Sequence, residues 1–236
     1  MSHFDAVKKA FPPSDTKVLL RGEIPPQVYT LLESAGYTHT PSRSAKALAD
    51  DKQAMYKFFK TNGFCCPQTL CGTKDSFEYE YLVQKLGTPF IAKPRFGSLG
   101  RGVTIVDSGT KLQSLPDCDW VFQIFIDTAC GTDCPRDVRI FAVGGMVAAV
   151  VERVGQKGGI VSNVHQGGMC ATKEVPVYVI TTALSAIKKA GLLYGTADFL
   201  YDGKTYYLCE INASPGFEGV EKLGVNIAKT IIQCLQ

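Results

Sequence analysis

Three kinds of feature are missing from this 236-residue sequence, and each absence excludes a class of protein. No apolar run approaches the roughly 20 residues of a membrane span, and the N-terminus lacks the apolar core of a signal peptide. Basic residues are not grouped with aromatic ones into a nucleic-acid module, and the net charge is only +3. We therefore expect a cytoplasmic protein with neither a membrane nor a nucleic acid as its partner.

Histidine is scarce, and the cysteines form no regular pattern. Three histidines and nine cysteines, an odd number, favour free thiols in a reducing compartment over a disulfide framework. Cys130 and Cys134 (CGTDC) resemble a metal or redox pair, but a plain loop is the better interpretation because the chain has no second pair. The sequence also lacks the GxxxxGK[ST] loop and the dinucleotide GxGxxG fingerprint. With 45% hydrophobic residues, the chain can form one large domain or two small ones.

The stretch YYLCEINASPGFEG offers oxygen ligands on a predicted strand. Residues 206–211 are rich in aromatic and branched side chains, and alternation along the strand would place Glu210 and Asn212 on one face. Asp198 lies in an earlier strand-like run, TADFLY, and a hairpin loop of odd length around 202–204 would bring it to the same face; we predict such a loop. These oxygens suit magnesium, while a solvated hairpin explains the acids equally well.

An apolar strand ending in Lys93 leads into a glycine-rich loop, RFGSLGRG. Glycines let backbone N–H groups approach phosphate oxygens, and the ammonium group would neutralise them. A plain hairpin turn explains this stretch at least as well on its own. Lys52 starts a predicted helix over 51–61, and the apolar run over 120–126 predicts a central strand.

The GG pair within 136–152 indicates a second hairpin. With a two-residue turn, Asp137 would lie opposite Glu152, on a polar face shared with Arg139. Structural salt bridges explain such a cluster as well as a functional site does. The glycine-rich segment over 155–168 that follows is typical of a loop that closes over a ligand.

In this order, the features resemble the ATP-grasp ligases, and most closely the RimK-type branch of ribosomal-protein glutamate ligases and amino-carrier-protein ligases of lysine biosynthesis. EINASPGFEGVEKLGVNIA resembles the C-terminal signature of the branch, and RDVRIFAVGGMVAAVVERV with SNVHQGG resembles the central one. The resemblance covers 51–236 and, more weakly, 18–50. It implies an α+β ATP-grasp fold in which two subdomains with mostly antiparallel sheets, over 51–126 and 127–236, clasp ATP after a shortened N-terminal segment over 1–50.

The resemblance also implies binding of ATP and Mg²⁺, with Mn²⁺ as a substitute, and roles for individual residues. Arg139 and Asn163 would be the catalytic pair, facing the phosphates or the reacting carboxylate, and Asp137 would reach the ribose. The lysines and the glycine loop would hold the phosphates, and the end of the apolar strand would grip adenine. The implied metal ligands are Asp198, Glu210 and Asn212, and the remaining nucleotide-binding residues are Lys52, Lys93, Gly97, Ser98, Gly100, Gly102, Gln123, Ile124, Phe125 and Ser162.

The chain departs from the family pattern in several places. Ile124 replaces a glutamate that is usual in the hinge, so that adenine would be held through backbone groups. Val161 and Gln166 replace two family arginines. The N-terminal domain is shortened, and CGTDC is an added stretch.

The implied chemistry is attack of a substrate carboxylate on the γ-phosphoryl group of ATP, followed by capture of the acylphosphate by an amine. We therefore predict a carboxylate–amine ligase that adds an amino acid to a peptide, a protein tail or a small acid. Two alternatives stay open: an ATP-grasp kinase, whose product would be a phosphoester, and a nucleotide-binding module or partner subunit that has lost ligase activity. The short N-terminal segment suggests a homodimer that completes the acceptor site.

Overall fold

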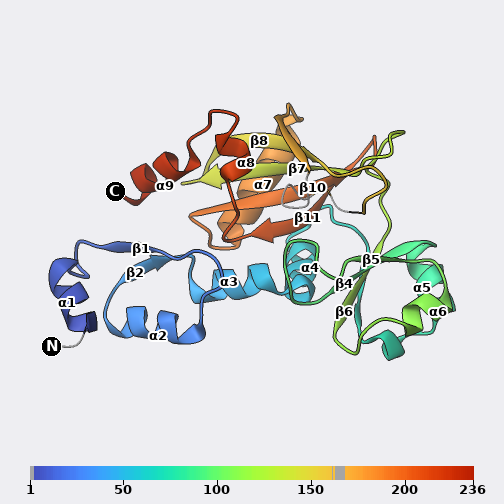
Figure 1. The fold of residues 1–236 in the computed structure, drawn as a ribbon, viewed down its shortest axis with the longest axis horizontal. Helices are drawn as coiled ribbons and strands as arrows, with labels where there is room; N and C mark the ends of the chain where they lie inside the picture. Colours follow the sequence, from blue (N-terminus) through green and yellow to red (C-terminus); the bar gives the residue numbers. More distant parts are fainter. Residues whose placement is uncertain (1–2, 161, 163–167) are drawn as a thin grey trace.

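The computed structural model describes residues 3–160, 162 and 168–236, and its elements form three groups in chain order (Figure 1). The first group is small: two short strands pair in parallel, and a helix packs on them through a cluster that includes Tyr29 and Tyr37. Pro26 opens that helix, at a position where its missing N–H leaves no bond unmade. The elements are α1 (His3–Ala10), β1 (Lys17–Leu19), α2 (Pro26–Ser34), β2 (Thr38–Thr40) and the connecting α3 (Arg43–Asp50).

The second group is an antiparallel four-stranded sheet in the order β3-β6-β4-β5. Successive side chains of its strands face opposite sides. Phe90 and Phe122 are therefore buried against α5 and α6, whereas Lys93 and Gln123 line a cleft on the other face. The elements are α4 (Lys52–Thr61), β3 (Thr69–Gly72), the 3-10 turn η1 (Lys74–Ser76), α5 (Tyr79–Leu86), β4 (Phe90–Pro94), β5 (Thr104–Val106), α6 (Gly109–Gln113) and β6 (Trp120–Ile124).

The third group is an antiparallel five-stranded sheet in the order β11-β10-β7-β8-β9. Helix α7 covers one face, and α8 and α9 pack on part of the other, through Phe141 and Tyr194. Within the described ranges, no helix is long and apolar enough to cross a membrane. The elements are β7 (Arg136–Val143), β8 (Met146–Val154), β9 (Met169–Thr172), α7 (Val177–Lys189), β10 (Tyr194–Tyr201), β11 (Tyr206–Asn212), α8 (Glu218–Glu221) and α9 (Ile227–Leu235).

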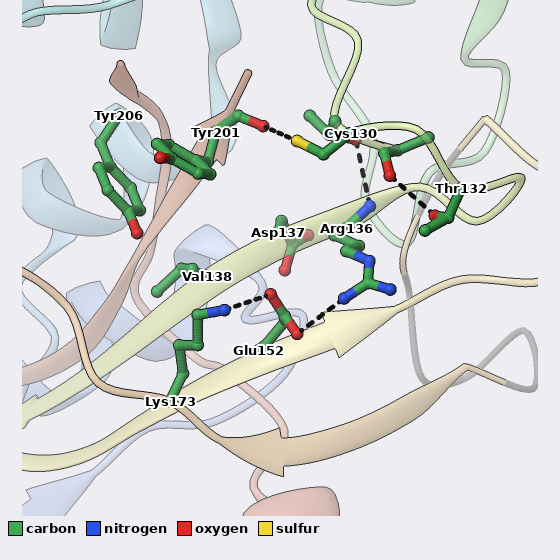
Figure 2. Close-up of a pocket in the computed structure, with 11 residues that line it drawn as sticks. Cys130, Thr132, Arg136, Asp137, Val138, Glu152, Lys173, Tyr201 and Tyr206 are labelled. Atoms are coloured by element: carbon green, nitrogen blue, oxygen red, sulfur yellow. Dashed lines mark hydrogen bonds and ion pairs between the residues drawn. The ribbon is translucent and has the colours of Figure 1, made fainter. Parts of the chain in front are cut away.

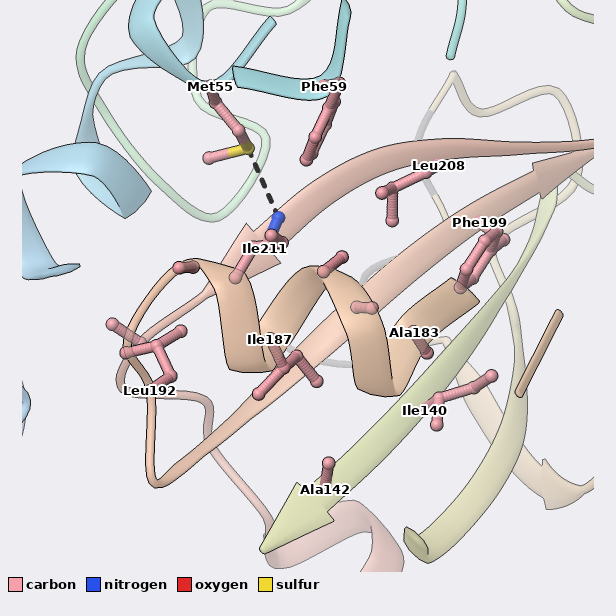
Figure 3. Packing of buried hydrophobic residues seen from close by; sticks show 14 of the residues in the cluster. Met55, Phe59, Ile140, Ala142, Ala183, Ile187, Leu192, Phe199, Leu208 and Ile211 are labelled. Atoms are coloured by element: carbon pink, nitrogen blue, oxygen red, sulfur yellow. Dashed lines mark hydrogen bonds between the residues drawn. The ribbon is translucent and has the colours of Figure 1, made fainter. Parts of the chain in front are cut away.

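The largest core joins the second and third groups (Figure 3). Ile187 of α7 and Phe199 of β10 are buried together, and Met55 and Phe59 of α4 pack into the same cluster. The sulfur of Met55 accepts a hydrogen bond from the backbone N–H of Ile211 at 3.2 Å. Burying Met55 and Phe59 stabilises this junction by roughly 3–6 kcal/mol, at about 1.5–3 kcal/mol for each side chain. The junction fixes the start of α4 beside β11.

The β10–β11 hairpin corrects the predicted loop length. Tyr201 pairs with Tyr206, which leaves a loop of even length over 202–205 rather than the odd loop that we predicted. A register shift after Asp198 then changes the parity, so that Asp198 pairs with Glu210 and Cys209 is the extra residue. The two carboxylates therefore share a face, as predicted, but a β-bulge and not the loop places them there.

A second bulge overturns the predicted pairing of Asp137. The GG turn gives the expected two-residue loop, because Val143 pairs with Met146, but the register shifts between Phe141 and Ala142. Asp137 consequently lies opposite Arg153, and Glu152 faces the opposite side of the sheet from Arg139. The predicted pair of Asp137 and Glu152 was wrong because the bulge near the GG turn cannot be recognised from the alternation of apolar and polar residues.

Candidate active site

A cleft of about 990 Å³ lies between the four-stranded and five-stranded sheets. It collects most of the residues that the sequence suggested, from seven separate segments of the chain. Gly102 does not line it, and Asn163 lies outside the described residues, as do Val161 and Gln166. The predicted residues that line the cleft are Lys52, Lys93, Gly97, Ser98, Gly100, Gln123, Ile124, Phe125, Asp137, Arg139, Ser162, Asp198, Glu210 and Asn212.

Two lysines reach the cleft from the second group of elements. Lys52 Nζ, at the start of α4, donates to the carbonyl oxygen of Gly97 at 2.7 Å, and Lys93 Nζ donates to Gln123 Oε1 at 2.7 Å. Burial, followed by the neighbouring Lys93, lowers the pKa of Lys52, although Glu210 opposes this. Both ammonium groups thus donate to neutral acceptors. Among the described residues, neither makes an ion pair, so that their charge is suited to an anion.

The glycine-rich loop between β4 and β5 is tied to the start of α4. Asp51 caps α4 by accepting hydrogen bonds from Gln53 N and Ala54 N, and its carboxylate also accepts two from Arg95, at 2.9 and 2.7 Å. Sequence reasoning did not identify Arg95, although it begins the loop. The ion pair fixes the loop's first residue to the helix that carries Lys52.

Glycine is required in this loop for two different reasons. Gly97 and Gly100 line the cleft with φ of 121° and 72°, a conformation that favours glycine. Gly102 has φ of 73° and packs on Pro94, whose Cγ would lie 2.7 Å from an added Cβ. Gly102 therefore determines the path of the loop by packing on Pro94, and it does not line the cleft.

The acidic side chains share the cleft face of the large sheet. Asp198 on β10 lies opposite Glu210 on β11, and Asn212 follows two residues later. Arg139 donates to both oxygens of Asp198, at 2.8 and 2.6 Å. Burial raises the pKa of Asp198, but Arg139 and then Arg153 outweigh it and lower that pKa overall. Asp198 is thus held as a carboxylate.

Arg153 is a second residue of the site that sequence reasoning missed. It donates to the two oxygens of Asp137, at 2.6 Å each, and to Asp198 at 2.8 Å. Ser162 also donates to Asp137, so both oxygens of this carboxylate already accept hydrogen bonds. Burial lowers the pKa of Arg153, but Asp198 and Asp137 raise it by more. One buried guanidinium group therefore links the two aspartates, and contact of Asp137 with a ribose would require an exchange of these bonds.

Glu210 has no such cation. Among the described residues, no group donates a hydrogen bond to its carboxylate. Burial and then Asp198 raise its pKa, against the lowering effect of Lys52, Arg139 and Lys93. The two guanidinium groups are in contact with Asp137 and Asp198, so that Glu210 is the carboxylate without a direct ion pair among the described residues, and Lys52 and Lys93 act on it only at longer range. The cluster favours an additional cation at that place.

The oxygen atoms around Glu210 fit a magnesium ion. Glu210 is unpaired within the described chain, and Asn212 Oδ1 accepts one hydrogen bond, from Ser214 N at 3.0 Å, which leaves a second lone pair. Hard divalent cations take ligands of this kind. Asp198 shares the face but is bound to two arginines, and the described residues contain no cluster of three or more His, Cys, Asp or Glu side chains arranged for a metal. Glu210 and Asn212 are thus the more available ligands.

The end of β6 also lines the cleft. Gln123 is held on both sides, by Lys93 and by Thr69, whose hydroxyl oxygen accepts from Gln123 Nε2 at 3.0 Å. The backbone N–H of Ile124 donates to the carbonyl oxygen of Gln68 at 3.0 Å, and Phe125 follows half-exposed. Because the N–H of Ile124 already donates a hydrogen bond within the chain, an adenine bound through backbone groups would have to use backbone atoms other than this N–H.

Comparison with solved structures shows the fold. The fold is similar to D-alanine–D-alanine ligase from Bacillus anthracis complexed with ATP, with a TM-score of 0.72, 19% identity, and coverage of 99% of this chain and 82% of that one. It is also similar to a RiPP-associated ATP-grasp ligase of Chryseobacterium gregarium, with a TM-score of 0.71, 21% identity, and coverage of 89% and 66%. The predicted α+β ATP-grasp fold is confirmed.

Comparison of sequences then gives the family. The model of the RimK-like ATP-grasp domain matches residues 49–235. A probable alpha-L-glutamate ligase of Legionella pneumophila (strain Corby) is 30% identical over 246 residues, which cover 100% of this chain and 77% of that protein. The chain belongs to the RimK-like ATP-grasp family. The predicted enzyme class, an ATP-grasp carboxylate–amine ligase, is confirmed at that level.

Proposed function

We propose that this enzyme uses ATP and Mg²⁺ to join a carboxylate to the amine of an amino acid, and that the carboxylate belongs to a peptide, a protein tail or a small acid. One observation carries the proposal: in a single cleft, Lys52 of α4 and Lys93 of β4 lie opposite the arginine-bound carboxylate cluster of the five-stranded sheet. The lysines bind the phosphate groups of ATP, and the unpaired Glu210 binds the metal ion that accompanies them.

Each wall of the cleft has a part in this scheme. Lys52 and Lys93 bind the phosphates, and the loop with Gly97, Ser98 and Gly100 folds over them. The end of β6, from Gln123 to Phe125, holds adenine. Asp137 reaches the ribose by exchanging its bonds to Arg153 and Ser162, and Asn163, which lies outside the described residues, would stand near the phosphates.

Positioning and charge neutralisation account for catalysis in this scheme. A carboxylate oxygen of the acceptor attacks the γ-phosphorus, the bond to the β-phosphate bridging oxygen breaks, and ADP leaves. The amine then attacks the acyl carbon, loses a proton, and displaces phosphate. Arg139 is released from Asp198 to stabilise charge on the transferred group. Glu210, Asn212 and Asp198 would hold Mg²⁺, which would supply neutralisation of the phosphate charge. Mn²⁺ could replace it because it accepts the same oxygen ligands.

The N-terminal segment provides a wall for the acceptor. Gly22 N donates to Ser214 Oγ at 2.8 Å, and the Arg21 guanidinium lies 3.9 Å from the ring centre of Phe217 and donates to Pro215 O at 3.1 Å. The segment therefore rests on the loop that follows β11, beside Asn212. Gly22 and Glu23 line the cleft at this end, which suits an acceptor larger than a free amino acid.

Relatives support the choice of substrate class. The Legionella relative is named as a probable alpha-L-glutamate ligase, and the Chryseobacterium structure holds ADP with a leader and core peptide. Glutamate as the added amino acid and a peptide as the acceptor are thus the first substrates to test. A homodimer that completes the acceptor wall would show as a dimer in size-exclusion chromatography with light scattering.

The decisive assay follows the product. The enzyme is incubated with ATP, Mg²⁺, a panel of amino acids, and either acidic peptides or small acids, and products are identified by mass spectrometry. An amide together with ADP supports the ligase, and a stable phosphoester indicates a kinase. Tight ATP binding without turnover of any acceptor would contradict the proposal and indicate a binding module.

A further inference from the structure

A second and smaller cavity, of about 220 Å³, lies on the face of the large sheet that is turned away from Arg139 (Figure 2). Alternation along β7 places Arg139 toward the large cleft and Val138 toward the small cavity, while Thr128, Arg136 and Asp137 line both. Glu152, displaced to this side by the bulge, forms part of its wall. The proposed ligase chemistry does not use Arg136, Val138 or Glu152.

The charged wall of the cavity has two cations, Arg136 and Lys173, and two acids, Glu152 and Asp137, of which Asp137 is already bound by Arg153. The Glu152 carboxylate accepts from Arg136 Nη1 at 3.3 Å and from Lys173 Nζ at 3.0 Å, so that one acid serves two bases. The Nε of Arg136 is buried and has no hydrogen-bond partner in the described part of the chain. By contrast, Nε of Arg139 and Nε of Arg153 each donate to a carboxylate. A buried donor without a partner costs about 1–3 kcal/mol. A second carboxylate would meet the exposed end of the Arg136 side chain, which is 37% exposed, together with Lys173, which is 38% exposed.

The opposite wall is aromatic. The rings of Tyr201 and Tyr206 stack with their centres 4.2 Å apart and at 21°, and Tyr178 meets Tyr206 edge-on at 6.4 Å. The Tyr201 hydroxyl donates to Gly203 O at 2.7 Å, which fixes that ring. A rigid aromatic surface facing a pair of cations suits a ligand that has a planar or apolar body and one negative charge.

The added CGTDC segment forms the rim of this cavity. Cys130 and Gly131 both have positive φ, of 50° and 84°, and make a tight turn in which Thr132 N and Oγ1 donate to Ala129 O at 3.0 and 2.8 Å. Cys130 Sγ contacts the carbonyl oxygen of Tyr201 at 3.6 Å. From the sequence, we predicted a plain loop for this segment; in the structure its residues Cys130 and Thr132 line the cavity.

We propose that this cavity is a second binding site, for a small monocarboxylate with a planar or apolar body. Its carboxylate binds between Arg136 and Lys173, and its body lies against Tyr206. The site adjoins the nucleotide cleft, with which it shares Thr128, Arg136 and Asp137, and does not depend on the proposed ligase function.

The test is a ligand-observed NMR titration of the full chain with benzoate, with the neutral benzyl alcohol as the matched probe. We expect saturable binding of benzoate at one site and much weaker binding of the alcohol. Lys173→Met should weaken benzoate binding by at least about tenfold, because it removes a charged donor, and Tyr206→Leu should weaken it as well. Lys157→Met is the charge-matched control, since Lys157 pairs with Asp133 near the rim and is exposed, and it should leave binding unchanged.

Lys93→Met separates this site from the large cleft. Benzoate binding that survives Lys93→Met and is lost with Lys173→Met supports the proposal. The reverse pattern would place the anion in the nucleotide cleft and overturn it, as would the absence of saturable binding to a chain whose circular dichroism shows it to be folded.

Discussion

Arg153 offers a quantitative test of the charge network. Its guanidinium makes three hydrogen bonds to two buried carboxylates, so that Arg153→Met would leave Asp137 without its main cation while Asp198 keeps Arg139. Removing one partner of a buried pair typically costs about 3–5 kcal/mol, because the remaining charge is buried and unpaired. Domains of ordinary stability unfold with about 5–15 kcal/mol, so this loss is a large fraction of the total.

Urea unfolding followed by far-UV circular dichroism measures this loss as a shift in the midpoint. If the cost arises from the unpaired Asp137, then adding Asp137→Asn to the Arg153→Met variant should recover about half of it or more. Lys157→Met removes an exposed pair and should change the free energy of unfolding by less than about 1 kcal/mol. An Arg153→Met variant as stable as Lys157→Met, or a double variant with no recovery, would refute the account of the network.

Three further predictions concern the site. The pKa of Glu210 is raised in the folded state, so its ionisation opposes folding above the unfolded pKa of about 4.3. Glu210→Gln should therefore stabilise the ligand-free enzyme by an amount that grows as the pH rises from that value. The same variant should bind Mn²⁺ more weakly, as measured by electron paramagnetic resonance. A stability difference independent of pH would contradict this. The pKa of Lys52 is lowered, so ATP affinity should fall as the pH rises toward about 10, and the fall should begin at a lower pH than for an ordinary lysine. Lys52→Arg should flatten this pH dependence in equilibrium binding assays. Equal pH profiles of the two proteins would exclude the role of Lys52. Gly102→Ala places a Cβ 2.7 Å from Pro94 Cγ at positive φ and should cost about 1–2 kcal/mol in urea unfolding and raise KM for ATP, whereas an unchanged KM would show that the loop's shape does not matter.

The sequence predicts the elements of the site better than their pairing. The strands that carry Asp198 and Glu210, the lysine at the end of β4 and the helix that starts at Lys52 all follow from local patterns. The loop length and the partner of Asp137 do not, because each depends on a bulge, at Cys209 and after Phe141, that changes register without changing the alternation.

Arg153 shows the same limit at the level of a side chain. It follows Glu152 in VVERV, and alternation alone puts one of the two on the cleft face without saying which. The two-residue turn, counted without a bulge, selected Glu152, and the observed register selects Arg153. Long-range contacts such as Lys52 with Gly97 could be inferred only through the family resemblance, because they depend on how separate sheets pack.

The central claim is that ATP activates a carboxylate as an acylphosphate, and hydroxylamine tests it most directly. Hydroxylamine replaces the amine and captures an acylphosphate as a hydroxamate. The account predicts that an acidic peptide, ATP and Mg²⁺ give a peptide hydroxamate and ADP in equal amounts, and that Glu210→Gln abolishes both. ADP formed with an acceptor that turns over, but without hydroxamate, would contradict it and indicate phosphoryl transfer to a hydroxyl group.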